Sequence, residues 1–234
     1  MKAFAVRIIS AVCASENRML ACALGFGLLL SLGAAVVRAA SYAERTQSGI
    51  AAGVVRLHIP ANSDSAEDQA VKLLVRDALL PRVNECLAIA ADKAEAIVLL
   101  TEALPALEQT ANDTLAANGF GYGAHASIDS AFFPSRTYGD VSLPAGPYDA
   151  LRVALGDGAG GNWWCMVFPP LCFVDITQAN ASPALKESLD ALLDADGAAL
   201  VLHGDSAEVR ARFWVVEAWQ GLKERFKLEG KTKE

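Results

Sequence analysis

Residues 54–77, with the sequence VVRLHIPANSDSAEDQAVKLLVRD, predict a strand followed by a helix, and the rest of the fold is organised around this pair. The run Val54–Ile59 is rich in β-branched and apolar residues and is followed by a proline, which is typical of a strand. Apolar residues then recur at helical spacing at Val71, Leu74, Val75 and Ala78. Asp64 is placed to cap this helix, with Glu67 three residues later as its reciprocal partner.

A second helix is predicted directly after the first. Asp92 is a suitable N-cap because Glu95 follows at the capping-box spacing. The pair Asn118-Gly119 is typical of a helix end, since both residues tolerate the left-handed conformation. Pro81 is expected to end or kink the first helix, and Pro105 to disturb the second, because proline removes a backbone donor.

The chain then changes to strand signals. Apolar and polar residues alternate over 124–132 and 151–155, which predicts half-buried strands. Two further apolar runs cover 163–168 and 171–176, separated by Pro169-Pro170. Apolar residues at helical spacing predict a closing amphipathic helix through Val215, Trp219, Leu222 and Phe226. This order of elements predicts an α+β domain of mixed strands and about three helices.

The first part of the chain contains a long uncharged segment, Met19–Val37 (MLACALGFGLLLSLGAAVV). A helix of this length spans about 28 Å, close to the hydrocarbon thickness of a bilayer. A cleaved signal peptide and an uncleaved anchor both fit, and either delivers the remainder across a membrane. We therefore divide the chain into a signal or anchor (1–43), a small and polar tether (44–53), an exported domain (54–228) and a polar tail (229–234).

The exported part is acidic. Residues 1–43 hold four of the 20 basic and one of the 27 acidic residues, so the remainder carries a formal charge of −10. Such a surface argues against nucleic-acid partners and against charge-driven binding to anionic lipid.

The cysteines suggest a disulfide and no metal site. In an exported chain Cys165 and Cys172 are candidates for a short-loop disulfide, although two packed thiols fit equally well. The spacings CxxC and HxxxH are absent, so neither zinc nor another metal is expected.

Catalytic templates largely fail. His58, Ser63 and Asp64 lie close in sequence and would supply a base, a nucleophile and an orienting carboxylate for an exported hydrolase. The cap predicted at Asp64 competes with that role. Gly156, Gly158 and Gly161 spell GxGxxG, but a strand-connecting loop fits this context better than a dinucleotide site. No catalytic residue and no cofactor are therefore expected.

Two aromatic segments favour contact with a partner: FFPSRTYGD (132–140) and NWWCMVFPPLCFVD (162–175). Aromatic and arginine side chains dominate protein interfaces. We predict a partner-binding surface from the following residues: Arg136, Tyr138, Asp140, Trp163 and Trp164. For the tryptophans, the competing interpretation is that they form the core of a small sheet.

Three blocks of the chain resemble the stage II sporulation protein R family of endospore-forming bacteria. These are 56–77 (RLHIPANSDSAEDQAVKLLVRD), 133–140 (FPSRTYGD) and 143–175 (LPAGPYDALRVALGDGAGGNWWCMVFPPLCFVD). The pair NWWC and FPPLCF is highly specific. Pro60 departs from the aliphatic residue expected there, which suggests that the strand ends earlier. Residues 179–207 match nothing in the family pattern.

The resemblance implies a signal and no catalyst. Family members are made in the forespore and exported into the space between forespore and mother cell. There they activate a membrane-embedded aspartic protease, which processes the precursor of the sporulation sigma factor sigma-E. The alternative is an exported hydrolase or ligand-binding domain that uses His58, Ser63 and Asp64.

Overall fold

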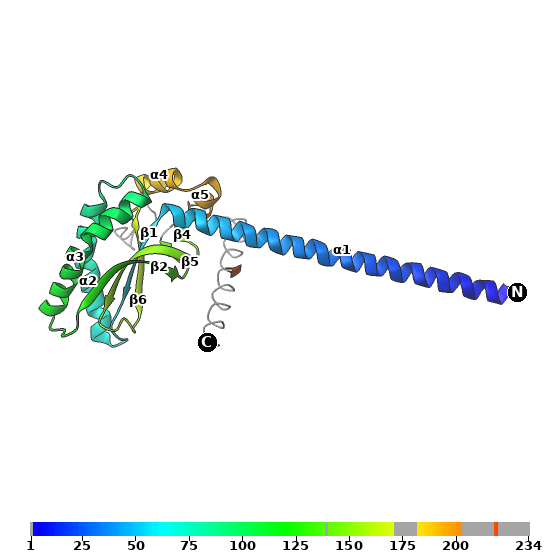
Figure 1. Ribbon diagram of the computed structural model, residues 1–234, viewed down its shortest axis with the longest axis horizontal. Helices are drawn as coiled ribbons and strands as arrows, with labels where there is room; N and C mark the ends of the chain where they lie inside the picture. Colours follow the sequence, from blue (N-terminus) through cyan, green and yellow to red (C-terminus); the bar gives the residue numbers. More distant parts are fainter. Residues whose placement is uncertain (1, 139, 171–181, 203–217, 220–234) are drawn as a thin grey trace. The chain divides into compact units, whose positions relative to one another are not determined.

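The computed structural model describes residues 2–138, 140–170, 182–202 and 218–219, with side chains from residue 19 onward except residue 21 (Figure 1). The chain divides into two units, Met1–Tyr42 and Ala43–Glu234. Several predicted features lie outside the described residues: the apolar run 171–176, which includes Cys172, most of the closing helix, and the tail 229–234.

The first helix, α1 (Lys2–Gly53), begins in the first unit and ends in the second. Its segment Cys22–Gly53 is long and apolar enough to cross a membrane, with a mean hydropathy of 1.9. Large side chains such as Leu24, Leu28 and Leu32 are exposed. This segment is compatible with secretion or with membrane anchoring, as the sequence predicts.

The segment 44–53, which is expected from the sequence to be a tether, is helical. These residues form the last turns of α1, and Thr46, Gln47 and Ile50 are buried. The Gln47 side chain donates to the carbonyl oxygen of Pro147 at 2.8 Å. Small and polar residues suit a loop, but here they are the residues that fit closely against a strand.

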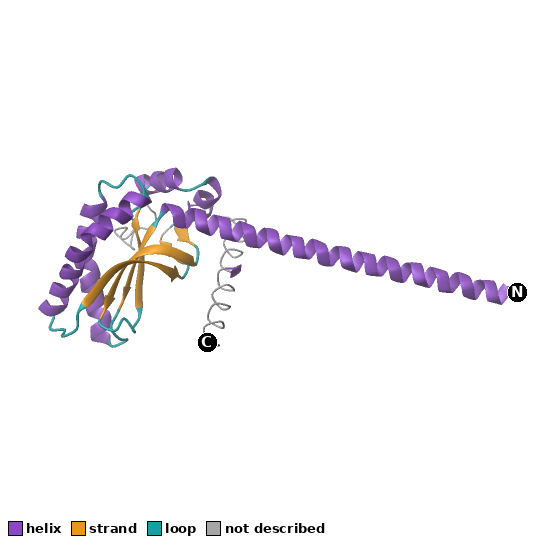
Figure 2. Cartoon of the chain, viewed as in Figure 1, coloured by secondary structure: helices purple, strands orange, loops and turns teal. Residues whose placement is uncertain are grey.

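The second unit contains a four-stranded sheet in the order β2-β5-β1-β6 (Figure 2). The strands are β1 (Val55–Pro60), β2 (Ala124–Phe133), β5 (Gly146–Leu155) and β6 (Asn162–Phe168). The central pair β1 and β5 is parallel, whereas β6 pairs antiparallel with β1 and β2 antiparallel with β5. A separate hairpin joins β3 (Arg136–Tyr138) to β4 (Val141–Leu143). The strand β1 includes Pro60, so it does not end earlier.

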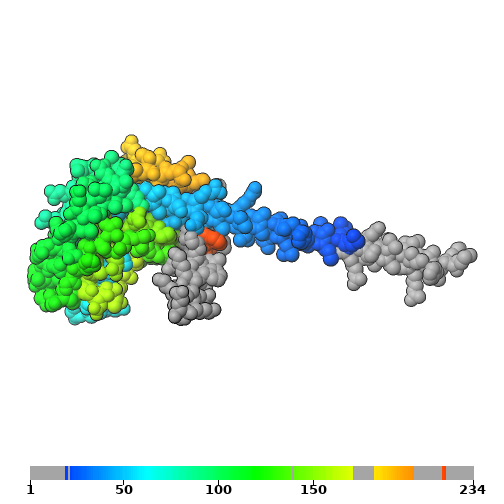
Figure 3. All heavy atoms as spheres, viewed as in Figure 1, coloured from blue at the N-terminus to red at the C-terminus, as the bar shows by residue number. Residues whose placement is uncertain are grey.

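Two helices cover one face of the sheet, which gives the α+β class that the sequence predicts (Figure 1). They are α2 (Ala66–Leu87) and α3 (Lys93–Ala117), and their apolar sides form the main core with the strands. Two shorter helices follow in the segment without family pattern, α4 (Pro183–Leu192) and α5 (Ala195–Leu202). In Figure 3 the yellow and orange spheres of α4 and α5 adjoin the green spheres of the helical layer.

Some helix boundaries differ from the prediction. Pro81 and Pro105 lie inside α2 and α3 and end neither helix, because buried residues on both sides hold each helix to the core. Asp92 caps α3 as predicted and accepts from the Glu95 N–H. The helix ends before Gly119, which has a φ of 81°. The cap of α2 is Ser65 and not Asp64, a correction explained below by the partner that Asp64 binds instead.

Candidate functional site

The strand β1 sends its side chains alternately to the two faces of the sheet. Leu57 and Ile59 join the core under α2 and α3, whereas Arg56 and His58 lie on the other face. Both polar side chains are nevertheless buried, with Arg56 0% and His58 9% exposed. A buried charge without compensation is costly, so this second face calls for an explanation.

Arg56 lies at the centre of a cluster that joins the sheet to the hairpin. Its Nε donates to the Cys165 carbonyl oxygen at 3.0 Å, and its Nη2 donates to the Tyr138 hydroxyl at 3.3 Å. The guanidinium carbon lies 4.4 Å from the ring centre of Phe133 and 5.1 Å from that of Tyr148. Aromatic faces attract a cation, which offsets part of its lost hydration.

The burial of Arg56 is incompletely compensated. Its Nη1 is buried and has no hydrogen-bond partner in the described part of the chain. None of the ion pairs recorded there involves Arg56 either. Burial accordingly lowers the pKa of its guanidinium. The arrangement therefore keeps a desolvated positive charge at the junction of sheet and hairpin.

His58 extends the cluster along the same strand. Its ring stacks on Trp164, with ring centres 3.8 Å apart and an interplanar angle of 11°. Its Nε2 lies 2.7 Å from the Asn162 side-chain oxygen, so Nε2 carries the proton in this hydrogen bond. Burial lowers the pKa of His58, and the bond to Asn162 opposes that shift only in part. The neutral imidazole is the form that suits this site.

Tyr138 fixes the hairpin to the edge strand. Its hydroxyl accepts from Arg56 and donates to the Trp164 carbonyl oxygen at 3.0 Å. Burial raises the pKa of this phenol, and the nearby Arg56 charge counteracts the rise. The hairpin is thus held at a fixed place on the sheet by the side chains of Arg56 and Tyr138 and by backbone carbonyl oxygens of β6.

The five predicted partner-binding residues do not form one surface. Tyr138 and Trp164 meet in the cluster, and Arg136 is exposed on the same hairpin. Asp140 forms an ion pair with Lys186 of α4. Trp163 lies on the opposite, helix-covered face, where the Arg76 guanidinium of α2 sits 4.2 Å from its ring centre. The reason is the two-residue period of a strand, which separates adjacent tryptophans.

The residues of the alternative hydrolase site each have a different partner. His58 binds Asn162, Ser63 donates to Asp68 at 2.5 Å, and Asp64 accepts from the Gly161 N–H at 2.7 Å. Asp64 therefore binds the loop at Gly161 and is neither a helix cap nor part of a triad. These three residues form no catalytic arrangement.

Asp68 is the carboxylate that the sequence reading missed. It is buried and accepts from Asn62 at 2.9 Å and from the Ser63 and Tyr122 hydroxyls at 2.5 Å each. The Ser63 hydrogen bond is the largest cause, with Tyr122 and Asn62 next, of the lowered pKa of Asp68. The signal available in the sequence was the polar run ANSDS before a helix, which marks a hydrogen-bonded turn.

The glycine-rich segment is a loop between β5 and β6, as expected. Gly156 and Gly158 have φ values of 54° and 61°, which favour glycine. A Cβ on Gly160 would lie 2.0 Å from the Ser63 carbonyl oxygen, so this glycine permits backbone contact between two loops. A strand follows the glycines instead of a helix, so no dinucleotide fingerprint is formed.

Two further features lie around the end of β6. Cys165 is almost fully buried and is disulfide-bonded. Its pairing with Cys172 stays a prediction, because Cys172 lies outside the described residues. A mainly apolar cavity of about 540 Å³ lies nearby between the end of α2 and α4, and Phe168, Pro169 and Pro170 form one wall. The FPP motif therefore shapes a surface hollow.

The fold and the site together define a class of protein. It is an α+β domain that follows an apolar helix compatible with export or anchoring, and its sheet carries a buried arginine–aromatic cluster on the face opposite the helices. The chain belongs to the stage II sporulation protein R family, whose model matches residues 51–178, more than half of the chain. The predicted resemblance is confirmed, and the match includes β1 to β6 and the whole cluster.

A stage II sporulation protein R of Bacillus subtilis (strain 168) is similar to this chain. The two are 37% identical over 127 residues, which are 54% of this chain and 57% of that protein. The chain thus matches a little over half the length of this relative. No solved structure matches the chain. The family membership associates this chain with sporulation.

Proposed function

We propose that this chain is an intercompartment signal of endospore formation and has no catalytic activity of its own. It is made in the forespore and acts from the outer side of the forespore membrane, either secreted or anchored. There it activates a membrane-embedded aspartic protease that processes the sigma-E precursor. The family membership supports this role, and the apolar segment of α1 supports the location.

The observation that carries the proposal is the anchoring of the hairpin by Arg56, Tyr138 and Trp164. An activator must bind the active state of its target more tightly than the inactive state. Moving a target from mostly inactive to mostly active requires roughly 5 kcal/mol of differential affinity. A rigid surface meets that demand better than a mobile loop, because little ordering entropy is lost on binding.

The contact surface that we propose is the exposed side of the hairpin together with the half-exposed ring of Trp164. Arg136 and Thr137 are exposed there, and Arg136 forms no ion pair within the described residues. Arginine and tryptophan are the residue types that contribute most to binding hot spots. Trp163 is excluded from this surface because it lies on the helix-covered face.

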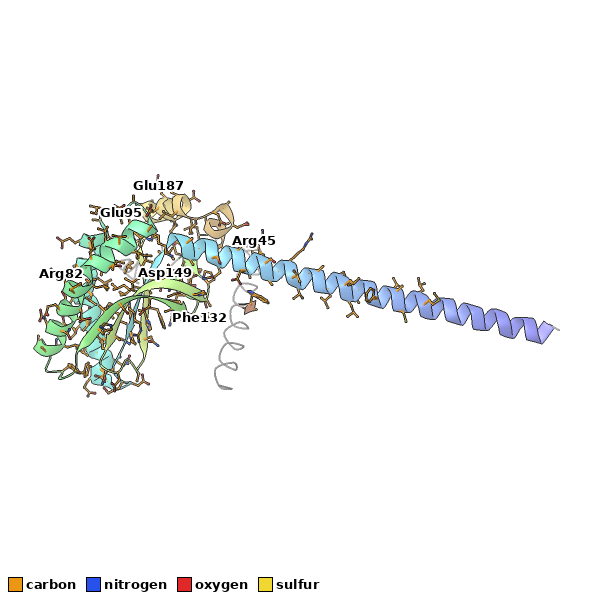
Figure 4. The ribbon with its side chains drawn as sticks, viewed as in Figure 1. Arg45, Arg82, Glu95, Phe132, Asp149 and Glu187 are labelled. Atoms are coloured by element: carbon orange, nitrogen blue, oxygen red, sulfur yellow. The ribbon has the colours of Figure 1, made fainter. Side chains whose placement is uncertain are left out.

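The proposal is tested by co-expressing the full chain, the protease and the precursor in a host that does not sporulate. Immunoblotting detects cleavage of the precursor, and we expect cleavage only when the chain is present. Arg136→Ala is expected to reduce cleavage by about tenfold or more, as loss of a hot-spot arginine does. The matched control is Arg82→Ala. Arg82 is an exposed arginine of α2, labelled in Figure 4, and lies outside the hairpin.

Three outcomes would contradict the proposal. Cleavage without the chain would show that it is no activator. Equal loss with Arg82→Ala and Arg136→Ala would deny a role to the hairpin. Loss of cleavage in Asp64→Asn at normal protein level would favour the hydrolase alternative, because the amide oxygen of asparagine still accepts from Gly161 and preserves the loop.

A further inference from the structure

The strand β2 is an edge of the sheet, and only half of that edge is closed. Within the sheet β2 pairs with β5 alone, in a continuous register from Ala124 to Phe133. In an antiparallel pair the backbone groups of alternate residues face the partner strand, and those between face outward. An edge strand therefore presents a row of unpaired donors and acceptors to other chains.

Side chains of α3 close the first half of this edge. Asn112 binds both backbone groups of Ala124, accepting from its N–H at 2.7 Å and donating to its carbonyl oxygen at 3.5 Å. Glu108 accepts from the Ala126 N–H at 2.8 Å. Ala124 and Ala126 are thus outward-facing residues, and the alternation makes Ile128, Ser130 and Phe132 the next three.

The second half of the edge is open. The outward backbone groups of Ile128, Ser130 and Phe132 have no backbone or side-chain partner in the described structure. Asp129 and Ser130 are exposed, and the side chains of Ile128 and Phe132 are partly exposed. Figure 4 labels Phe132 at the end of this strand. The fold satisfies one half of the edge with dedicated side chains and leaves a three-residue ladder free.

The sequence of the open half is complementary to itself. If two copies pair antiparallel about Ser130, residue 130 lies opposite residue 130 of the second copy, and Ile128 lies opposite Phe132. All outward groups of these residues then form hydrogen bonds, as in an isologous two-fold interface. Each aliphatic–aromatic pair adds a favourable cross-strand contact. Asp129 lies opposite Ala131, so no two like charges face each other directly.

We propose that the open half of β2 pairs with the same segment of a second copy, which makes the chain a two-fold dimer with a continuous eight-stranded sheet. Such an edge contact buries much less than the roughly 1,200 Å² of a stable soluble interface. The dimer therefore forms when the copies are concentrated on a membrane by the apolar segment of α1. This inference is independent of the proposed protease partner.

The experiment is cysteine cross-linking of the full chain in membranes. Hydrogen-bonded residues of antiparallel strands have Cα atoms about 5.5 Å apart, which a disulfide spans. Ser130→Cys is expected to give about tenfold more disulfide-linked dimer than the wild-type chain, whose native cysteines set the background. The control is a cysteine at the exposed Thr101 of α3, which lies outside β2.

The register provides a stricter test with two tagged copies. Ile128→Cys in one copy and Phe132→Cys in the other are expected to cross-link to each other. Neither variant is expected to cross-link to itself. In this register residue 128 of one copy is offset by four positions from residue 128 of the other, which places the two about 13 Å apart along the strands. Asp129→Asn is expected to raise the yield of the Ser130→Cys dimer. The Asp129 carboxylates of the two copies would lie diagonally about 7–8 Å apart, and the substitution removes their repulsion.

Several results would overturn the proposal. Dimer at the wild-type background for Ser130→Cys, with correct folding verified by circular dichroism, would exclude the contact. Self-cross-linking of Ile128→Cys would exclude this register. A Ser130→Cys cross-link to a different protein would show that the edge serves another partner. Ser130→Pro removes an outward N–H that has no partner in the monomer, so it is expected to keep the fold and abolish the 128-to-132 cross-link.

Discussion

The two faces of the sheet in the second unit are both buried, but they differ in what fills them. On one face Leu57 and Ile59 of β1 pack with the apolar sides of α2 and α3. On the other, Arg56 and His58 of the same strand pack against Phe133, Tyr148 and Trp164, beside the hairpin. The first face is a non-directional apolar core, whereas the second depends on directed contacts of two titratable groups.

This difference separates stability from specificity. Apolar contacts stabilise many arrangements of similar volume. A buried guanidinium with two fixed hydrogen bonds tolerates a single arrangement, and it places the hairpin that we propose as the contact surface. Substitutions on the helix-covered face are therefore expected to cost stability, and those on the other face to cost the position of the hairpin.

The largest effect is expected for Leu57→Ala. Leu57 is fully buried in the helix-covered core, so the variant loses transfer free energy and leaves a cavity. We expect a loss of about 2–5 kcal/mol in the free energy of unfolding. Denaturant titration followed by tryptophan fluorescence measures it. A cost below that of Arg56→Met would reverse our comparison of the two faces.

Removal of the disulfide at Cys165 comes next, because its buried side chain belongs to the helix-covered face. With Cys172 as the partner, the short loop predicts a loss of about 2–3 kcal/mol on Cys172→Ser. Mass spectrometry checks the pairing, since trypsin releases both cysteines in one peptide, residues 153–186. That peptide should resist alkylation until it is reduced, and alkylation beforehand would exclude the bridge.

Arg56→Met is expected to cost less, at most about 2 kcal/mol. It removes a buried charge with an unpaired Nη1, which offsets part of the hydrogen bonding lost at Cys165 and Tyr138. The distinguishing result is faster hydrogen exchange of residues 136–143, because the hairpin loses its anchor. Unchanged exchange there would show that Arg56 does not position the hairpin.

His58 makes stability depend on pH. The folded state holds the pKa of His58 below its usual 6.5, so the unfolded chain takes up a proton first as the pH falls. Stability is fully present above pH 6.5 and declines between there and the folded-state pKa, by at most about 1.4 kcal/mol per pH unit. His58→Phe is expected to lose this slope in thermal melts. The exposed His125→Gln variant serves as the control.

The smallest effect is expected for Arg76→Ala on the helix-covered side. Its guanidinium contacts the ring of Trp163, and such contacts are worth about 0.5–1 kcal/mol near a surface. A double-mutant cycle with Trp163→Leu isolates this term. A coupling energy near zero would show that Arg76 contacts the Trp163 ring without a cation–π contribution to stability.

The sequence predicted most elements because each has a local cause. The alternation at 124–132 and 151–155, the cap at Asp92 and the stop at Gly119 depend on neighbours within a few residues. The cap at Asp64 failed for a non-local reason: the loop at Gly161 offers a backbone N–H to that carboxylate. Pro81 and Pro105 end neither helix, because tertiary packing outweighs the loss of one helical hydrogen bond.

The candidate site was predicted in part. The aromatic composition of 132–140 and 162–175 pointed to Tyr138 and Trp164, but the period of a strand put Trp163 on the other face. Arg56 gave no signal, because an arginine inside VVRLHI is as typical of an exposed strand position as of a buried one. Its role depends on Tyr138 and Cys165, both more than eighty positions away.

The sequence by itself determined the apolar segment, the α+β class, the strand and helix order and the family, since all of these are written in local patterns or in the NWWC and FPP blocks. Only the tertiary structure decided which residues share a face, which loop holds Asp64, and which half of β2 stays open. Those features arise where segments distant in the chain meet, and the geometry of that meeting is set by packing, which no local pattern encodes.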